Sequence, residues 1–160
     1  IRVFEANVIR ISDGDTFNVV DKEGKRHCIR IANIDAPETQ QAFGRDATGV
    51  LAELLASGHA TITHYRDDHK LCKYGNRRIA LVSVGGKDIG ESMLLRGAAW
   101  YYGAFKSDWS VASHHTWSNA QTSARDMRRG LWVAPTPLPP WEFRAAKKGT
   151  ALTNSTNQTN

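Results

Sequence analysis

The stretch VFEANVIRISDGDTFNVVDKEGKRHCIRIANI (residues 3–34) decides the fold, because it holds three runs rich in β-branched residues separated by two turns. Gly14 lies in the first turn, and the polar residues 21–25 make up the second. The runs span residues 3–11, 16–20 and 27–34. The stretch therefore predicts a meander of three antiparallel strands.

The rest of the chain adds two strands and about three helices. Apolar residues at i, i+3, i+4, i+7 and i+8 predict a helix over 47–55, closed by Gly58. Further elements are expected in this order: a strand over 60–65, a loop over 66–76, a strand over 79–84, a short helix over 89–95 and a helix over 113–127. Five strands ordered three, helix, two predict a β-barrel plus α fold, a closed five-stranded OB-fold barrel, because closure removes exposed sheet edges.

The C-terminal part of the chain has a different composition. From Pro135 a proline-rich segment predicts an extended strap, held on the surface through Trp132 and Trp141. After Arg144 the residues are polar and predict a disordered tail. We therefore expect one domain over residues 1–144 and a tail over residues 145–160.

The bulk composition favours a soluble globular protein that attracts polyanions. Of 160 residues, 41% are hydrophobic and 23% charged, and no apolar run approaches the roughly 20 residues that span a bilayer. Lys and Arg outnumber Asp and Glu by 21 to 16, giving a net charge of +5. The two cysteines lack the CxxC spacing of a zinc site. Because the chain begins at Ile1 instead of methionine, it is either a processed mature form or a trimmed chain, and the first alternative gives the expectation of a secreted or periplasmic protein.

Four acidic residues and one arginine gather in and just after the meander: Asp13, Asp15, Arg30, Asp35 and Glu38. Two carboxylates from adjacent segments, with a backbone carbonyl and waters, suit a hard cation, and the residue types favour calcium or magnesium over zinc. Hydrolysis of a phosphodiester needs an activated water, a cation on the phosphate oxygens and further positive groups where charge accumulates. These residues therefore predict a metal-dependent phosphodiesterase.

The hairpin geometry indicates how close Arg30 lies to the acids. The second turn is centred near residue 23, so residues whose numbers sum to about 46 face one another. Arg30 is then opposite Thr16, and an error of one residue would place it across from Asp15 or Phe17. Arg30 is thus expected near Asp15, but the register does not decide on which face of the strand it lies.

Three motifs in this order resemble the staphylococcal nuclease family. They are DGDT at 13–16, RIANIDAPE at 30–38 and KYG at 73–75, and the likeness extends over roughly residues 6–132. Several separated motifs are together much more specific than any one of them. The resemblance implies an OB barrel with helices, calcium-dependent cleavage of DNA and RNA, and products that end in 3′-phosphate.

The resemblance also implies roles for single residues. Asp15 and Asp35 would be ligands of one calcium ion, together with the backbone carbonyl of Ala36. Glu38 would be the base or would position the water, and Arg30 would bind and stabilise the phosphate. DNA and RNA would be the substrates. Separately, we expect a monomer that does not enter a membrane.

Two departures from the family pattern affect these roles. The family more often has threonine where Ala36 stands, which removes a hydroxyl but leaves the carbonyl. Its Tyr-Gly-Arg is here Tyr74-Gly75-Asn76-Arg77-Arg78, so either arginine could be the second phosphate ligand. We choose Arg77, because it keeps the family's Arg-x-x-Ala spacing.

Substrate contacts are expected outside the acid cluster as well. Lys73 and Tyr74 resemble the nucleotide-contacting pair of the family, and Tyr101 or Tyr102 could stack on a base, with Tyr102 the one we choose.

A disulfide between Cys28 and Cys72 would brace the site. Cys28 lies two residues before Arg30 on the same side of its strand, and Cys72 opens the segment that carries Arg77. If both arginines converge on one phosphate, the two cysteines approach each other.

The alternative function is a barrel that binds nucleic acid or a protein without cutting. Loss of the acids is its usual mark, and this chain keeps Asp15, Asp35 and Glu38.

Overall fold

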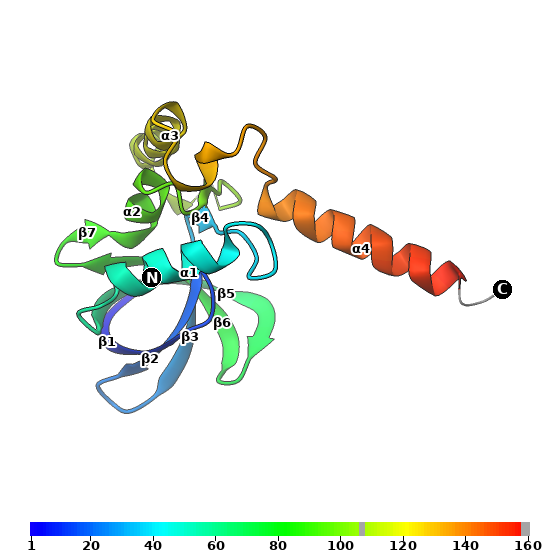
Figure 1. Ribbon diagram of the computed structural model, residues 1–160. Coiled ribbons are helices and arrows are strands. Elements are labelled where there is room, and N and C mark those ends of the chain that lie inside the picture. Colours follow the sequence, from blue (N-terminus) through cyan, green and yellow to red (C-terminus); the bar gives the residue numbers. More distant parts are fainter. Residues whose placement is uncertain (106–107, 158–160) are drawn as a thin grey trace.

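Five strands close into a barrel in the computed structural model, which describes residues 1–105 and 108–157 (Figure 1). They are β1 (Arg2–Ile11), β2 (Thr16–Asp21), β3 (Arg26–Ile31), β5 (His59–Cys72) and β6 (Gly75–Val84). Neighbours pair antiparallel in the order β3-β2-β1-β5-β6, and parallel pairing of β3 with β6 closes the ring. The predicted barrel is confirmed, and the short strand β7 (Lys87–Asp88) pairs with β6 outside it.

The hairpin of β2 and β3 has the predicted register, with Thr16 opposite Arg30 and Phe17 opposite Ile29. Ile29 and Ile31 belong to the main hydrophobic core and are fully buried. Because successive side chains of a strand point to opposite faces, Arg30 lies on the other face of β3. The strand thus holds the core with one face and presents its arginine outside it with the other.

Residues 66–76 do not form the expected loop, and this prediction is wrong. β5 continues to Cys72 and β6 begins at Gly75, so the two strands form a long hairpin in which Leu71 pairs with Asn76. The register is irregular between Asp67 and Leu71, and most side chains of this extension are exposed or half-buried. A two-stranded ribbon that faces solvent on both sides needs no apolar alternation, which is why the sequence pattern missed it.

Three helices occupy the predicted places. α1 (Gly44–Leu54) packs Ala47 and Leu51 into the barrel core, α2 (Ile89–Leu95) follows β7, and α3 (Val111–Asp126) lies against α2. The side chain of Asp88 caps α2 and that of Ser110 caps α3, each by accepting a backbone N–H three residues on. The short strands β4 (Ile34–Asp35) and β8 (Trp100–Tyr101) pair beside the barrel, with Asp35 opposite Trp100.

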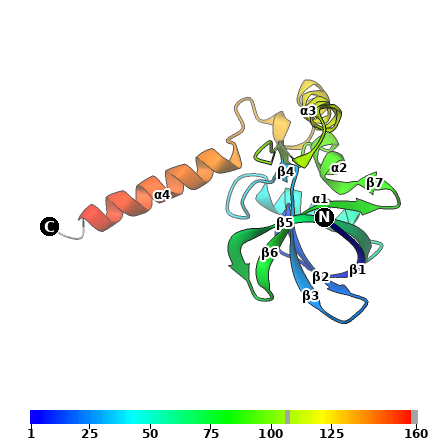
Figure 2. The ribbon, with the colours of Figure 1, turned by 180° about the vertical axis from the view of Figure 1, so that it is seen from behind.

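The C-terminal segment differs from the predicted strap and tail. After the 3-10 helix η2 (Gly130–Val133), a fourth helix, α4 (Pro140–Asn157), includes the first residues expected to be disordered and extends away from the barrel (Figures 1 and 2). Pro140 is the first helical residue, where its fixed φ and missing N–H are tolerated. The predicted boundary at residue 144 falls inside α4, and residues 158–160 of the predicted tail lie outside the described residues.

The two tryptophans of the predicted strap have different places. Trp132 is buried in η2 in a small second core with Trp100, and Trp141 lies in the first turn of α4 with its ring against Trp100. Within the described ranges, no helix is both long and apolar enough to cross a membrane.

Candidate active site

The predicted acids and arginines meet around one open cavity of about 460 Å³. Its lining includes the following predicted site residues: Asp15, Arg30, Asp35, Ala36, Glu38, Arg77 and Tyr102. They come from the β1–β2 turn, β3, β4 and the loop after it, β6, and the segment that follows β8. Residues far apart in the sequence are therefore brought to one place by closure of the barrel.

Close packing of the β1–β2 turn places Asp15 beside the loop that follows β4. A Cβ added to Gly14 would lie only 2.7 Å from the Cβ of Ala36 and 2.9 Å from that of Ala47, so glycine allows this approach. The Ala36 N–H donates to Asp15 Oδ2 at 2.8 Å, and the Thr16 hydroxyl donates to Oδ1 at 2.9 Å. The carboxylate of Asp15 is thus fixed from two sides.

Arg30 lies between the two predicted calcium ligands. Its Nη2 is 3.6 Å from Asp15 Oδ2 and 3.5 Å from Asp35 Oδ1, and its Nη1 donates to the carbonyl oxygens of Ile31 and Ile34. The residue is only 8% exposed, so a charged guanidinium is held here by charge pairing and hydrogen bonds that replace water. Both carboxylates therefore converge on one nitrogen atom.

The two acids of the β1–β2 turn titrate differently. Burial pushes the pKa of Asp15 upward, but the charge of Arg30 and the hydrogen bonds that Asp15 accepts outweigh it, so this pKa lies below its usual value. Burial, followed by the negative charge of Asp15, raises the pKa of Asp13 to about 7. Asp15 therefore keeps its charge at neutral pH, as a cation ligand requires.

The donor set fits a hard divalent cation in residue type. The predicted ligands Asp15 and Asp35 are carboxylates that share Arg30 as a neighbour, and Ala36 lines the same cavity. Among the described residues, no group of three or more His, Cys, Asp or Glu side chains is arranged to hold a metal ion. Any ion here would thus rely on two carboxylates, backbone oxygen and water.

The second arginine lies in the same cavity as the first. Arg77 lines it and donates from Nε to Asp68 Oδ2 at 2.9 Å, with a second hydrogen bond from Nη2 to the same oxygen. Arg78 is outside the described lining, and its Nη1 is 3.3 Å from His64 Nδ1. The position of Arg77 agrees with its choice over Arg78, whereas its role on a phosphate stays a prediction.

The predicted substrate contacts are not all near the cavity. The guanidinium of Arg30 lies 5.5 Å from the ring centroid of Tyr102, which lines the cavity. Tyr101 instead places its hydroxyl 2.6 Å from His114 Nδ1. Lys73 and Tyr74 lie at the tip of the β5–β6 hairpin, and neither is among the described lining residues. They can contact only the parts of a substrate that extend beyond the cavity.

The hypothesised disulfide is present. Cys28 of β3 and Cys72 at the end of β5 are joined with their Cα atoms 6.5 Å apart, across a sequence separation of 44. The bond ties the long hairpin, which carries Arg77, to the strand that carries Arg30.

Arg144 lines the cavity and contacts the acids, although it was not among the predicted site residues. Arg144 of α4 donates to both oxygens of Asp35 and to Glu38 Oε1, although it lies 109 residues after Asp35. It stands where the composition changes to a polar tail, and no motif or periodicity marks it. Only the three-dimensional docking of α4 brings it to the acids.

The barrel and its cluster of acids and arginines define a hydrolase of the phosphodiester backbone. The family model described as staphylococcal nuclease homologue matches residues 28–134. The chain belongs to this family and is a phosphodiesterase nuclease. Nucleases of this family need a divalent ion, and the nuclease relatives imply nucleic acid as the substrate.

Three relatives illustrate the likeness. An uncharacterized endonuclease of Escherichia coli O157:H7 is 35% identical over 140 residues, which cover 88% of this chain and 84% of that protein. Micrococcal nuclease of Shigella flexneri is 33% identical over 159 residues, covering 96% and 85% respectively. Staphylococcal-like nuclease CAN1 of Arabidopsis thaliana is 33% identical over 125 residues, covering 78% of this chain and 35% of the longer plant protein.

Proposed function

We propose that this nuclease is a calcium-dependent endonuclease of low sequence specificity that cuts DNA and RNA and leaves 3′-phosphate ends. The main support is that Asp15 and Asp35 flank Arg30 at one open cavity. A phosphodiester placed there would contact both the ion held by Asp15 and Asp35 and the guanidinium of Arg30. The acid and arginine set is the one that the family resemblance predicted.

The residues of the cavity would have separate roles in cleavage. Asp15 and Asp35 would hold one calcium ion with their carboxylates, and Ala36 would add its backbone carbonyl. When bound, this ion supplies positive charge to the phosphate oxygens as the bond breaks. Glu38, whose side chain is 37% exposed, is accessible to accept a proton from the attacking water.

The arginines would stabilise the phosphate as negative charge accumulates. Arg30 is fixed by two backbone carbonyls through Nη1, which leaves Nη2 directed to the space shared with Asp15 and Asp35. Arg77 must release Asp68 before it can bind a phosphate oxygen. This exchange is feasible because carboxylate and phosphate both accept two hydrogen bonds from one guanidinium. Such donors act most strongly where water is excluded.

Substrate contacts away from the scissile bond need little base discrimination. Tyr102 at the cavity and Lys73 with Tyr74 at the hairpin tip would contact bases and phosphates of the strand. Aromatic stacking tolerates any base at about 1–3 kcal/mol each, which is consistent with low specificity. We further propose a secreted or periplasmic monomer, a setting in which the Cys28–Cys72 bond would persist.

A cleavage matrix of plasmid DNA and RNA against calcium, magnesium and manganese tests the proposal. Cleavage with calcium and 3′-phosphate ends is expected. Asp15→Ala and Asp35→Ala should weaken calcium binding, whereas Glu38→Gln should lower turnover with the fold intact. Glu23→Gln removes an exposed acid in the β2–β3 turn and is the matched control, with unchanged activity.

The competing function, a barrel that binds nucleic acid or protein without cutting, predicts a different matrix. The wild-type protein would then retain a labelled oligonucleotide with every metal and cleave none. A metal-loaded sample with that behaviour would falsify the proposed activity.

A further inference from the structure

The first turns of α4 dock on the loop that carries the acids. The ring of Trp141 packs edge-on against Trp100, with centroids 5.5 Å apart, and Lys147 Nζ donates to Gln40 Oε1 at 2.6 Å. Beyond this point the helix extends away from the barrel (Figure 2). Its contacts with the body are therefore concentrated next to the segment from Asp35 to Gln41.

Arg144 is the residue of α4 that enters the cavity. Its Nη2 donates to Asp35 Oδ2 at 2.7 Å, and its Nη1 is 3.2 Å from Asp35 Oδ1 and 2.9 Å from Glu38 Oε1. One guanidinium therefore binds both oxygens of a predicted calcium ligand and one oxygen of the predicted base. The Asp35 side chain is 1% exposed, so little water can reach its oxygens to donate the hydrogen bonds that Arg144 now donates.

We propose that Arg144 and the divalent ion compete for Asp35, so that α4 acts as a latch over the acids. The inference rests on the proposed calcium site. An ion needs the oxygen lone pairs that the guanidinium fork now occupies, and two cations close to one buried carboxylate repel each other. Metal binding then releases Arg144 and, with it, the first turns of α4, which frees Glu38 for the reaction.

The first test measures calcium affinity by titration calorimetry, with no substrate present. Arg144→Gln should bind calcium about 10-fold more tightly, which corresponds to about 1.4 kcal/mol. We expect no larger effect, because the Arg144 side chain is 44% exposed and solvent weakens its ion pairs. Lys147→Gln removes the same charge from the same helix without touching an acid, and its affinity should match that of the wild type.

The second test follows amide hydrogen exchange over residues 140–149. Saturating calcium should speed exchange in the wild type, whereas Arg144→Gln should exchange fast with or without calcium. A calcium affinity of Arg144→Gln that is equal to or lower than that of the wild type would overturn the latch. A lower affinity would mean that Arg144 positions Asp35 for the ion instead of competing with it. Failure of both proteins to bind calcium would overturn the proposed metal dependence and the latch together, whereas equal binding overturns the latch alone.

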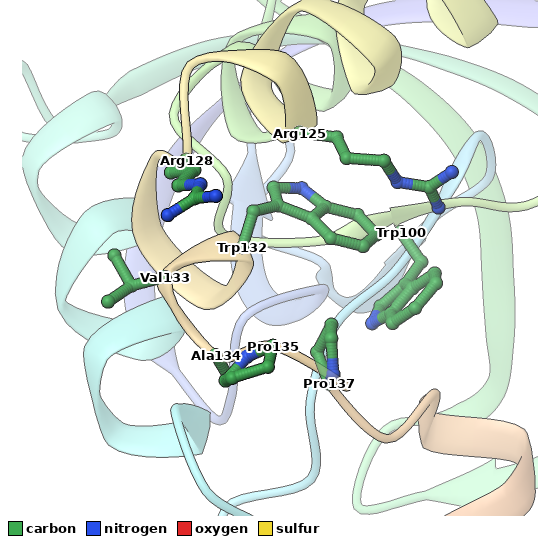
Figure 3. A pocket seen from close by; sticks show the side chains of 8 residues that line it. All are labelled: Trp100, Arg125, Arg128, Trp132, Val133, Ala134, Pro135 and Pro137. Carbon is green, nitrogen blue, oxygen red and sulfur yellow. The ribbon is translucent and has the colours of Figure 1, made fainter.

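A second cavity lies beside the β4–β8 pair and has a volume of about 500 Å³. Figure 3 shows its two tryptophans, Trp100 and Trp132, with Arg125 and Arg128 near them. The two indole rings meet edge to face at 4.5 Å, and the Arg125 guanidinium lies 4.5 Å from the centroid of Trp132. Trp100 and Trp132 are buried, at 9% and 6% exposed, whereas Arg125 and Arg128 are exposed, so the arginines are the groups that a ligand can contact.

The two arginines of this cavity differ in their partners from the arginines around the acids. Arg30, Arg77 and Arg144 are all ion-paired with carboxylates. Within the part of the chain that the structure describes, neither Arg125 nor Arg128 forms such a pair. Their charge is therefore available to an anionic ligand, such as the phosphates of a nucleic acid strand.

We infer that this cavity is a second contact for the single strand being cut, with its phosphates on Arg125 and Arg128. This too rests on nucleic acid being the ligand. Trp100 is paired directly with Asp35 across β4 and β8, so the cavity lies one strand away from the acids. A strand that extends a few nucleotides beyond the scissile bond can reach both places.

Fluorescence anisotropy with a labelled 12-nucleotide DNA strand in EDTA tests this contact without cleavage. The Arg125→Gln/Arg128→Gln protein should show a shallower dependence of log affinity on log salt, by about 1.4 for two lost phosphate contacts, and Arg128→Gln alone by about 0.7. Lys22→Gln/Lys25→Gln removes two charges from the β2–β3 turn and is the matched control. Slopes equal to those of this control would overturn the second contact, even if cleavage of short substrates proceeds normally.

Discussion

Gly14→Ala tests whether the acidic turn must lie against the loop that follows β4. The added methyl carbon would meet the Cβ atoms of Ala36 and Ala47 at 2.7 and 2.9 Å. Carbon atoms in contact normally lie about 3.5–4.0 Å apart, so the turn or its neighbours must move by about 1 Å. Overpacking of this kind costs about 1–3 kcal/mol of unfolding free energy.

The same displacement should weaken the candidate calcium site. Asp15 is held by the hydrogen bond of 2.8 Å from the Ala36 N–H, which is the contact that the methyl group pushes apart. Gly49→Ala is the matched control, because Gly49 lies inside α1 and a Cβ there meets no atom within 4 Å. This control should gain about 0.5–1 kcal/mol, since alanine restricts the unfolded chain and favours helix.

Guanidinium unfolding followed by tryptophan fluorescence gives the stability of the two variants, and calorimetry gives their calcium affinity. We expect Gly14→Ala to lose both stability and affinity, while Gly49→Ala keeps its affinity. If Gly14→Ala is as stable as Gly49→Ala and binds calcium like the wild type, the turn is not positioned by this contact and the reasoning is refuted.

Three further predictions concern the disulfide, the pH dependence and the base. Cys28→Ala/Cys72→Ser should lower the unfolding free energy by about 4 kcal/mol, because the bond closes a loop with a sequence separation of 44; a loss below about 1 kcal/mol contradicts this. Burial lowers the pKa of His27 from 6.5, so as the pH falls below 6.5 the unfolded chain binds a proton that the folded chain resists, and the unfolding free energy falls. His27→Gln should make the unfolding free energy depend less on pH between pH 7 and 5. Equal pH dependence of the variant and the wild type would exclude His27 as the source. Glu38→Gln should reduce kcat by about 10²–10⁴-fold with unchanged thermal stability, whereas near-normal turnover would remove Glu38 as the base.

Local patterns predicted the barrel and the neighbourhood of the acids. The turn centred near residue 23 set the register that places Thr16 opposite Arg30. This inference works because a short hairpin leaves few ways to pair its strands, and a slip by one residue would turn every core side chain outward. Asp35 follows directly from the end of the same meander, so its distance from Arg30 was also constrained by the chain.

Two features could not be obtained from local patterns, for different physical reasons. The hairpin extension to Cys72 and Gly75 is polar because solvent surrounds it, so the alternation that marks half-buried strands is missing. Arg144 reaches Asp35 only through the docking of α4, and no sequence period relates residues so far apart. The disulfide lies between these cases, since the strand of Cys28 was predicted and the position of Cys72 followed from the expectation that Arg30 and Arg77 meet at one phosphate.

A crystal structure of the wild-type protein with calcium, with the ion located by its anomalous scattering, tests the central claim most directly. We predict one ion within about 2.3–2.6 Å of carboxylate oxygens from both Asp15 and Asp35, with Arg144 withdrawn from Asp35. An ion bound elsewhere in crystals of protein that cleaves DNA, or an ion on Asp15 alone with Arg144 still on Asp35, would contradict the account.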